Sequence, residues 1–260
     1  MEQIIKTDYY SIYANKHNSI YQIRFPTSQY VLIKSMLKTP CLAGTGASTD
    51  DLYKTITFKA ESVKTLDQYI HEQKMITGRP CLSITNTIKL TQSLTHQLSH
   101  LITQSQHTII GYNPESIIMI NDKTSAFLGS EFIVEIDASS EETTIFCPFM
   151  PYDAFFSPEI LTHKQLPMNV HYKTAYFSLA CLVLYVLLGE NEFYREFIQE
   201  NPSIQEIPSK YIPNKYNPTK YNPNSLLRYL QHHPIKDTKL YWVLSRCLTE
   251  DPRQRSIIYL

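Results

Sequence analysis

Glycine is scarce in this 260-residue chain, which contains six glycines where an average protein of this length has about three times as many. The first is Gly44, so no glycine-rich phosphate-binding loop can lie in the first 43 residues. Neither common nucleotide-binding motif, GxGxxG or GxxxxGK followed by Ser or Thr, occurs anywhere in the sequence. Folds that hold phosphates on bare backbone therefore lose their main signature here.

The chain also lacks an excess of charge of either sign. Lys plus Arg and Asp plus Glu both number 24, and charged residues make up 18% of the chain, which is below the roughly 25% of a typical globular protein. Nucleic-acid-binding domains usually carry a strongly basic surface. We therefore expect no nucleic-acid partner.

Paired cysteines and long apolar segments are missing as well. The longest apolar run, residues 175–188, contains Ser178 and is shorter than the roughly 18–20 residues of a membrane span. Residues 1–20 show no signal-peptide pattern. We expect a soluble, cytoplasmic protein with no membrane partner. The five cysteines stand singly, without a CxxC pair, and favour reduced core thiols: Cys41, Cys81, Cys147, Cys181 and Cys247.

Strand-like patterns dominate the first quarter of the chain. Alternating apolar residues and β-branched residues predict strands within 8–34 and 52–58, including Val31 to Lys34. A second strand signal at 117–128 predicts a short hairpin with its turn at 121–123. Residues 130–156 are acidic and show no regular period, so we expect irregular structure there.

Helical periodicity takes over after residue 62, and 43% hydrophobic residues are enough for a sizeable core. The pattern predicts an α+β fold, with a single domain over 1–260 that has a β-rich part at 1–60 and a mainly helical part at 61–260. Apolar spacing predicts helices at 63–70, 84–102, 172–188, 225–231 and 239–248.

A short repeat stands in a proline-rich segment, residues 201–224. Lys-Tyr-x-Pro recurs every five residues, at 210–213, 215–218 and 220–223. Proline at that spacing disrupts both helices and strands, so we expect a surface loop. Tyr211, Tyr216 and Tyr221 are candidate partner-binding residues, because tyrosine is favourable at interfaces. A spacer loop that contacts nothing is the alternative.

Six strings resemble, in order and nearly in spacing, the motifs of eukaryotic-type protein kinases. The resemblance covers roughly residues 10–260 and implies a bilobal kinase-like fold with a reduced N-lobe at 1–60, a helical C-lobe at 61–260 and a loop insertion at about 201–224. The strings, in family order, are VLIK at 31–34 (the lysine strand), TLDQYI at 65–70 (the helix after the hinge), YNPESIIMI at 112–120 (the catalytic loop), FFSPEI at 155–160 (the end of the activation segment), YFSLACLVLYVLLG at 176–189 (the buried helix) and CLTEDPRQR at 247–255 (the last motif).

The residues that carry phosphoryl transfer in this family are replaced. The catalytic aspartate corresponds to Gly111, its lysine partner to Asn113 and the metal-binding asparagine to Ser116. The segment that should hold the metal-binding aspartate, at Gly129, has Glu131 as its nearest acid. Further losses are the aspartate that braces the catalytic loop (Ala175), the glycines of the phosphate loop (aligned with 12–21) and a helix between Lys34 and Leu52 that would carry the lysine's glutamate partner.

The resemblance therefore implies a pseudokinase, which is a catalytically inactive kinase-like domain that acts as a protein-binding, scaffold or regulatory module. Its expected partners are proteins, such as an active kinase, a kinase substrate or a larger assembly; no cofactor and no metal are expected. The alternative is a divergent serine/threonine kinase that still binds ATP through unorthodox residues, with Lys34 as its nucleotide contact.

Two further residue pairs carry expectations. In the family, the glutamate of the Pro-Glu corner pairs with the arginine of the last motif, so we expect a largely buried ion pair between Glu159 and Arg255. His96 and His100 have the i, i+4 spacing of zinc ligands, but no glutamate lies between them and no third ligand accompanies them. We interpret both as surface histidines.

Overall fold

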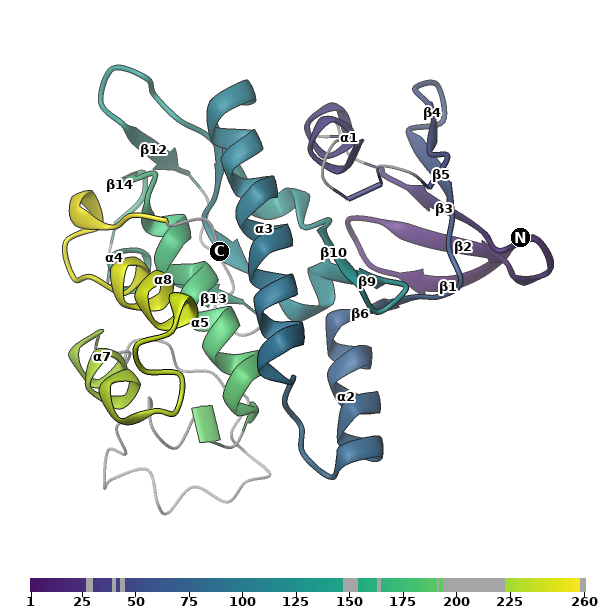
Figure 1. Ribbon diagram of the computed structural model, residues 1–260. Helices are drawn as coiled ribbons and strands as arrows, with labels where there is room; N and C mark the ends of the chain where they lie inside the picture. The colour runs from purple at the N-terminus through teal and green to yellow at the C-terminus, as the bar shows by residue number, and fades with distance from the viewer. Residues whose placement is uncertain are drawn as a thin grey trace, which may run out of the picture.

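The computed structural model describes residues 1–26, 30–38, 41–42, 45–146, 154–162, 165–190, 192–193 and 223–257. The fold is mixed α and β, as expected: strands dominate its N-terminal part and helices the remainder (Figure 1). Tyr211, Tyr216 and Tyr221 of the repeat, and Cys147, lie outside the described residues.

The N-terminal part is a five-stranded antiparallel sheet in the order β1-β2-β3-β5-β4. Ile12, Ile23 and Ile56 lie directly opposite one another on neighbouring strands and are at most 2% exposed, so one face of the sheet is a core face. The strands are β1 (Glu2–Lys6), β2 (Ser11–Asn15), β3 (Ile20–Arg24), β4 (Ser48–Asp50) and β5 (Thr55–Lys59).

Residues 30–34 are helical, and the prediction of a strand there was wrong. They begin α1 (Tyr30–Lys38), so Lys34 lies within a helix, and the described residues between Lys38 and Leu52 contain no further helix. Tyr30, Ile33 and Leu37 are buried at helical spacing, and the Tyr30 ring packs 5.9 Å from the Phe25 ring of the sheet. Packing against the sheet thus overrides the local β propensity of the Val-Leu-Ile run.

The remaining residues form a helical body, defined here as residues 61–257. As predicted, a long helix occupies residues 84–102 and a buried helix ends at Gly189, whose φ of 81° ends the helix. The helices are α2 (Leu66–Thr77), α3 (Ile84–Ser105), α4 (Pro158–Leu161), α5 (Thr174–Leu188), α7 (Pro223–His232) and α8 (Lys239–Cys247), with 3-10 turns η1 (Lys16–Asn18), η2 (Pro114–Ser116), η3 (Ser130–Phe132) and η7 (Pro252–Gln254).

Short strands in the helical body position the segments between its helices. The predicted hairpin is β9 (Ile117–Ile120) and β10 (Thr124–Phe127), and a strand at residues 63–65, where a helix was predicted, pairs with β9. Residues 130–156 also contain strands, which corrects the expectation of irregular structure. The other strands are β6 (Val63–Thr65), β7 (His107–Ile109) with β11 (Ile133–Glu135), β8 (Gly111–Tyr112) with β13 (Phe155–Phe156), and β12 (Glu142–Ile145) with β14 (Met168–His171).

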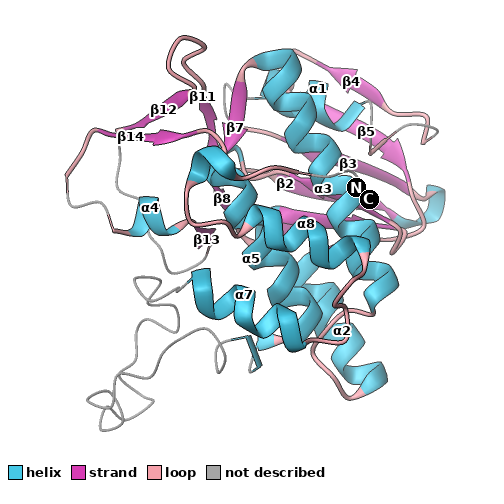
Figure 2. Cartoon of the chain, turned by 60° about the vertical axis from the view of Figure 1, so that its left-hand side comes forward, coloured by secondary structure: helices cyan, strands magenta, loops and turns pink. Residues whose placement is uncertain are grey.

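The sheet and the helical body are joined through α1 and α3. Ser35 of α1 and His100 of α3 share a hydrogen bond of 2.9 Å between Oγ and Nε2, and Cys41 Sγ donates to the Ser125 carbonyl oxygen at 3.4 Å. Figure 2 shows α3 running between the sheet and helices α5 and α8. In the part of the chain that the structure describes, no helix is both long enough and apolar enough to span a bilayer.

Candidate functional site

Gly111, Asn113 and Ser116 lie in one backbone segment, residues 109–116, that α5 and its own side chains hold in place. We call it the degenerate loop, because the sequence resemblance aligns it with the kinase catalytic loop. Ser178 of α5 donates from Oγ to the Ile110 carbonyl oxygen at 3.1 Å. Asn113 Oδ1 accepts the backbone N–H of Glu115 at 2.8 Å, and Pro114 starts the η2 turn. These hydrogen bonds fix the backbone of the loop. What the loop can bind or catalyse therefore depends on its side chains.

Gly111 and Gly129, which the sequence resemblance aligns with two kinase aspartates, are packed too tightly for a side chain. A Cβ atom on Gly111 would lie 2.5 Å from Phe156 Cε1, and one on Gly129 would lie 2.7 Å from Phe127 Cζ. Real Cβ atoms essentially never make contacts below 3.0 Å. Aromatic rings therefore occupy the space in which aspartate side chains would begin.

Ser116 and Glu131 are the two polar side chains that this region brings together. Ser116 Oγ donates to Glu131 Oε1 at 3.3 Å, whereas Glu131 Oε2 is buried without a hydrogen-bond partner. Burial raises the pKa of Glu131 to about 7. The carboxyl group therefore keeps its proton over a pH range in which an exposed glutamate has lost it.

The divalent metal that a kinase site would hold does not fit these residues. Mg²⁺ requires oxygen ligands in octahedral geometry, usually including a carboxylate. Gly129 has no side chain, Ser116 directs its hydroxyl at Glu131, and the Glu131 carboxyl is buried and readily protonated. Within the described ranges, no three His, Cys, Asp or Glu side chains come together as a metal centre would need.

Tyr10 of the N-terminal sheet reaches into the same region. It stands at the end of the turn between β1 and β2, residues 7–10, and its hydroxyl donates to the Glu115 carbonyl oxygen at 2.5 Å. Its side chain is 1% exposed, while the neighbouring Tyr9 is 37% exposed. The turn thus places a phenol ring against the degenerate loop.

The connection between the sheet and the helical body, residues 60–62, has all of its backbone N–H groups occupied within the chain. The Ala60 N–H donates to the Ser19 carbonyl oxygen at 3.0 Å. The N–H groups of Glu61 and Ser62 both donate to Asn121 Oδ1, at 2.7 and 3.2 Å. A ligand at this connection would find no free backbone donor.

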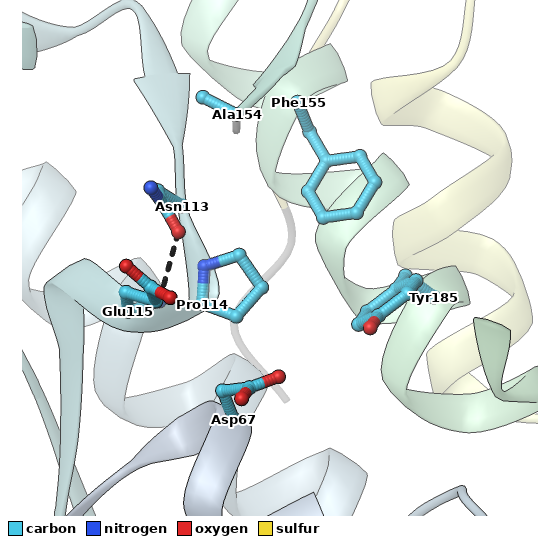
Figure 3. Close-up of a pocket in the computed structure, with 7 residues that line it drawn as sticks. All are labelled: Asp67, Asn113, Pro114, Glu115, Ala154, Phe155 and Tyr185. Carbon is cyan, nitrogen blue, oxygen red and sulfur yellow. Dashed lines mark hydrogen bonds between the residues drawn. The ribbon is translucent and has the colours of Figure 1, made fainter. Parts of the chain in front are cut away.

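A pocket of about 90 Å³ opens beside the loop (Figure 3). In Figure 3, Phe155 and Tyr185 lie together on one side, across from Asn113 and Glu115, with Asp67 below. The two rings are 5.1 Å apart between centroids and are buried, whereas both carboxylates are exposed. Among the described residues, neither Asp67 nor Glu115 forms an ion pair. The pocket therefore combines a buried aromatic side with two unneutralised negative charges.

Glu159 and Arg255 form the expected ion pair. Arg255 Nη1 and Nη2 both donate to the Glu159 carboxylate, and the Arg255 side chain is completely buried. Arg255 Nε also donates to the Thr249 carbonyl oxygen at 2.8 Å, and its guanidinium lies 5.0 Å from the Phe177 ring centroid. Thr174 donates to Glu159 Oε1 at 2.8 Å. Glu159 thereby connects α4 to the first residue of α5 and to the segment at residues 249–255.

Lys34 does not lie on a strand of the sheet, so its expected role as the strand lysine is wrong. Its ammonium group pairs with Asp51 at 2.8 Å and lies 5.3 Å from the Tyr30 ring centroid. His96 is exposed, as expected, and His100 is half-buried because it bonds to Ser35.

The sequence interpretation missed five residues of the site, because they come from separate elements. Tyr10 and Glu115 are 105 residues apart, and the catalytic-loop string that contains Glu115 gives no sign of Tyr10. The one usable signal was the capping box in which Gln68 follows Thr65, which places Asp67 in the first turn of α2. The missed residues are Tyr10, Asp67, Glu115, Phe155 and Tyr185.

No protein-family model matches the chain, and a search of curated proteins finds none that is detectably similar to it.

Proposed function

We propose that the chain is a catalytically inactive, protein-kinase-like domain, a pseudokinase, and that it acts as a protein-binding or scaffold module. The order of its elements supports a bilobal kinase fold. In protein kinases, the strand that carries the ATP-contacting lysine precedes a helix that carries the lysine's glutamate partner. Here β3 is followed by α1, and the sheet with α1 precedes the helical body.

Both members of that lysine–glutamate pair are absent from the corresponding elements. The residues of β3 that face the core are Tyr21 and Ile23, and both are buried. The α1 sequence, YVLIKSMLK, contains no acidic residue. The nucleotide would therefore lack its usual ammonium contact, and Lys34 is on the helix instead of the strand.

The observation that carries the proposal is the closure of the two aspartate positions by aromatic packing. Gly111 and Gly129 lack the catalytic side chains, and the space for those side chains is filled by Phe156 and Phe127. Neither the turn at 7–10 nor residues 12–21 contain glycine, and the turn brings Tyr10 onto the loop. Positioning and electrostatic stabilisation supply most of the catalysis of phosphoryl transfer, and the groups that provide them are missing together.

In contrast to the catalytic groups, the contacts that would stabilise a kinase-like helical lobe are present. The Glu159–Arg255 pair is bidentate and buried on its arginine side, and α5 is almost entirely buried. A chain that preserves the framework while closing the reaction site is suited to binding, because a binding module needs a stable surface and no turnover.

The pocket beside the loop is the contact that we assign to a protein partner. Its 90 Å³ corresponds to about three water molecules, and pockets for whole small molecules usually begin near 300 Å³. A side-chain head group therefore fits, whereas a nucleotide does not. Two carboxylates facing aromatic rings favour a cation, and arginine combines charge-assisted hydrogen bonds with stacking on rings. The partner would insert an arginine side chain between Glu115 and Phe155.

A nucleotide-binding test separates the proposal from the alternative of a divergent kinase. We expect millimolar ATP, with or without Mg²⁺ or Mn²⁺, to leave the melting temperature of the chain unchanged. Any ligand that binds only the folded state must raise that temperature. The variant Tyr10→Ala should behave in the same way, because it opens the loop without restoring a metal ligand. A metal-dependent rise in either protein would favour the kinase alternative.

A peptide series tests the pocket. We expect short arginine-containing peptides to cause NMR shifts at Phe155 and Tyr185, and we expect the shifts to vanish when citrulline replaces arginine. Asp67→Asn and Glu115→Gln should each weaken binding several-fold, because each removes one of the two charges. Glu141→Gln, which neutralises an exposed carboxylate elsewhere, is the control and should change nothing. Equal binding of citrulline peptides would contradict the assignment.

A further inference from the structure

Glu131 lies at the contact between the N-terminal sheet and the degenerate loop, and only one of its two carboxyl oxygens is satisfied. Ser116 Oγ donates to Oε1 across 3.3 Å, which is long for such a bond, and Oε2 is buried without a partner. Burying a neutral oxygen without a hydrogen bond costs far less free energy than burying an unpaired negative charge. The protonated carboxyl is therefore the form that this closed contact accommodates.

The turn at residues 7–10 docks on the loop directly beside this carboxyl group. Burial is the main cause that raises the pKa of both Tyr9 and Tyr10, and a smaller contribution from the Glu131 carboxylate places both phenols near it. Tyr10 holds the turn down through its hydrogen bond to the Glu115 carbonyl oxygen, and the Glu115 side chain is exposed. Ser116 follows Glu115 directly, so the turn, the loop and Glu131 meet at one point.

The elements next to Glu131 carry carboxylates and two tyrosines. Asp8 on the turn lies near Tyr9, and Glu115 on the loop lies near Tyr10, so each of these two elements contributes a carboxylate. Among the described residues, no lysine or arginine forms an ion pair with Glu131. Burial raises the pKa of Glu131 although the Ser116 hydroxyl and a backbone N–H lower it, so a charge on Glu131 would be desolvated, and water reaching Oε2 would relieve it.

We propose that Glu131 is a proton-operated latch for the turn at residues 7–10. With its proton, the carboxyl group stays buried and Tyr10 stays docked on Glu115. Without it, water must enter the contact to solvate Oε2, and the turn carrying Tyr10 lifts away from the loop. The latch exposes the loop, including Glu115 of the pocket, at mildly alkaline pH and covers it at mildly acidic pH. This inference does not depend on the proposed pseudokinase function.

The difference between the folded and unfolded pKa of Glu131 determines how stability changes with pH. Burial raises the pKa of Glu131 in the folded chain to about 7, above that of an unfolded glutamate. Between roughly pH 4.5 and 7 the folded chain binds a proton that the unfolded chain has lost, so stability falls as pH rises through that window. The loss is complete near pH 7, where the folded carboxyl group gives up its proton and the latch begins to open.

Hydroxyl-radical footprinting read by mass spectrometry tests the latch directly. The measured quantity is oxidation of Tyr10 relative to Tyr53, which is 62% exposed and serves as the internal standard. We expect Tyr10 oxidation in the wild-type chain to rise several-fold between pH 6 and pH 8.5. Glu131→Gln, a neutral isostere, should keep Tyr10 oxidation low at both pH values. Glu135→Gln, which removes an exposed carboxylate nearby, should leave the rise intact.

Two results would overturn the proposal. One is Tyr10 oxidation that does not change with pH in the wild-type chain or that rises equally in Glu131→Gln. The other comes from a carbon-13 NMR titration of the Glu131 carboxyl group: an apparent pKa below 5 would show that the carboxyl is already ionised in the closed contact. A midpoint near 7 that coincides with the rise in Tyr10 oxidation would support the latch.

Discussion

Arg255→Ala is expected to lower the free energy of unfolding by about 3–5 kcal/mol, which is the cost of removing one partner of a buried ion pair. For a chain of this size, such a loss lowers the melting temperature by roughly 10 °C. The reason is that the Glu159 carboxylate would keep its bond from Thr174 but lose both guanidinium donors. The Thr249 and Glu250 carbonyl oxygens would also lose their donor. Thermal and urea unfolding measure the effect.

The double-mutant cycle with Glu159→Ala gives this prediction its sharpest form. Glu159→Ala leaves a guanidinium that is completely buried, so a comparable loss is expected. The double variant should lose less than the sum of the two single losses, because neither charge is then left unpaired. Arg253→Ala, an exposed arginine two residues away, is the control and should change stability by no more than about 0.5 kcal/mol. Strictly additive losses would contradict a coupled pair.

The elements that were predicted correctly are those whose signal is local. The apolar periodicity of α3 and α5 extends over many turns, and Gly189 ends α5 where the sequence predicted. The hairpin of β9 and β10 has its strands and turn in adjacent residues. For these elements a local stretch of sequence contains the whole cause of the structure.

The elements that were missed depend on distant partners. Residues 30–34 have β-branched and aromatic character, but they become helical because Tyr30 and Ile33 pack on the sheet. Within residues 130–156, β11 pairs with β7 and β12 with β14, and none of these partners is adjacent in the sequence. Local propensity cannot reveal a pairing whose partner strand is unknown.

The same distinction explains the site. The glycines at 111 and 129 and the Glu159–Arg255 pair could be predicted, because each lies in a motif with a fixed spacing. The docking of Tyr10 on Glu115 could not, because it depends on how the sheet meets the helical body. The resemblance also predicted that neither position carries an aspartate, but not that aromatic rings fill the space beside both glycines.

The second large effect concerns Gly111→Asp, which places an aspartate where the kinase resemblance aligns the catalytic one. We expect it to destabilise the chain by about 3 kcal/mol or more and to restore no phosphoryl transfer. Its Cβ atom would lie 2.5 Å from Phe156 Cε1, in a position where β8 pairs with β13. Overpacking of a core typically costs about 1–3 kcal/mol, and a buried carboxylate without a cation adds to that cost.

Two comparisons separate steric from chemical failure of this variant. Gly46→Asp makes the same change where no atom lies within 4 Å, so it should cost only about 1 kcal/mol for its left-handed backbone. Combining Gly111→Asp with Phe156→Ala gives the aspartate room, so the double variant should lose less stability than the sum of the two single losses. Radiolabelled ATP should still transfer no phosphate to a generic substrate or to the chain itself, because Gly129 and Ser116 supply no metal ligand. Transfer that persists after contaminating kinases are removed, or a Gly111→Asp chain as stable as the wild type, would show that the aspartate site is still open.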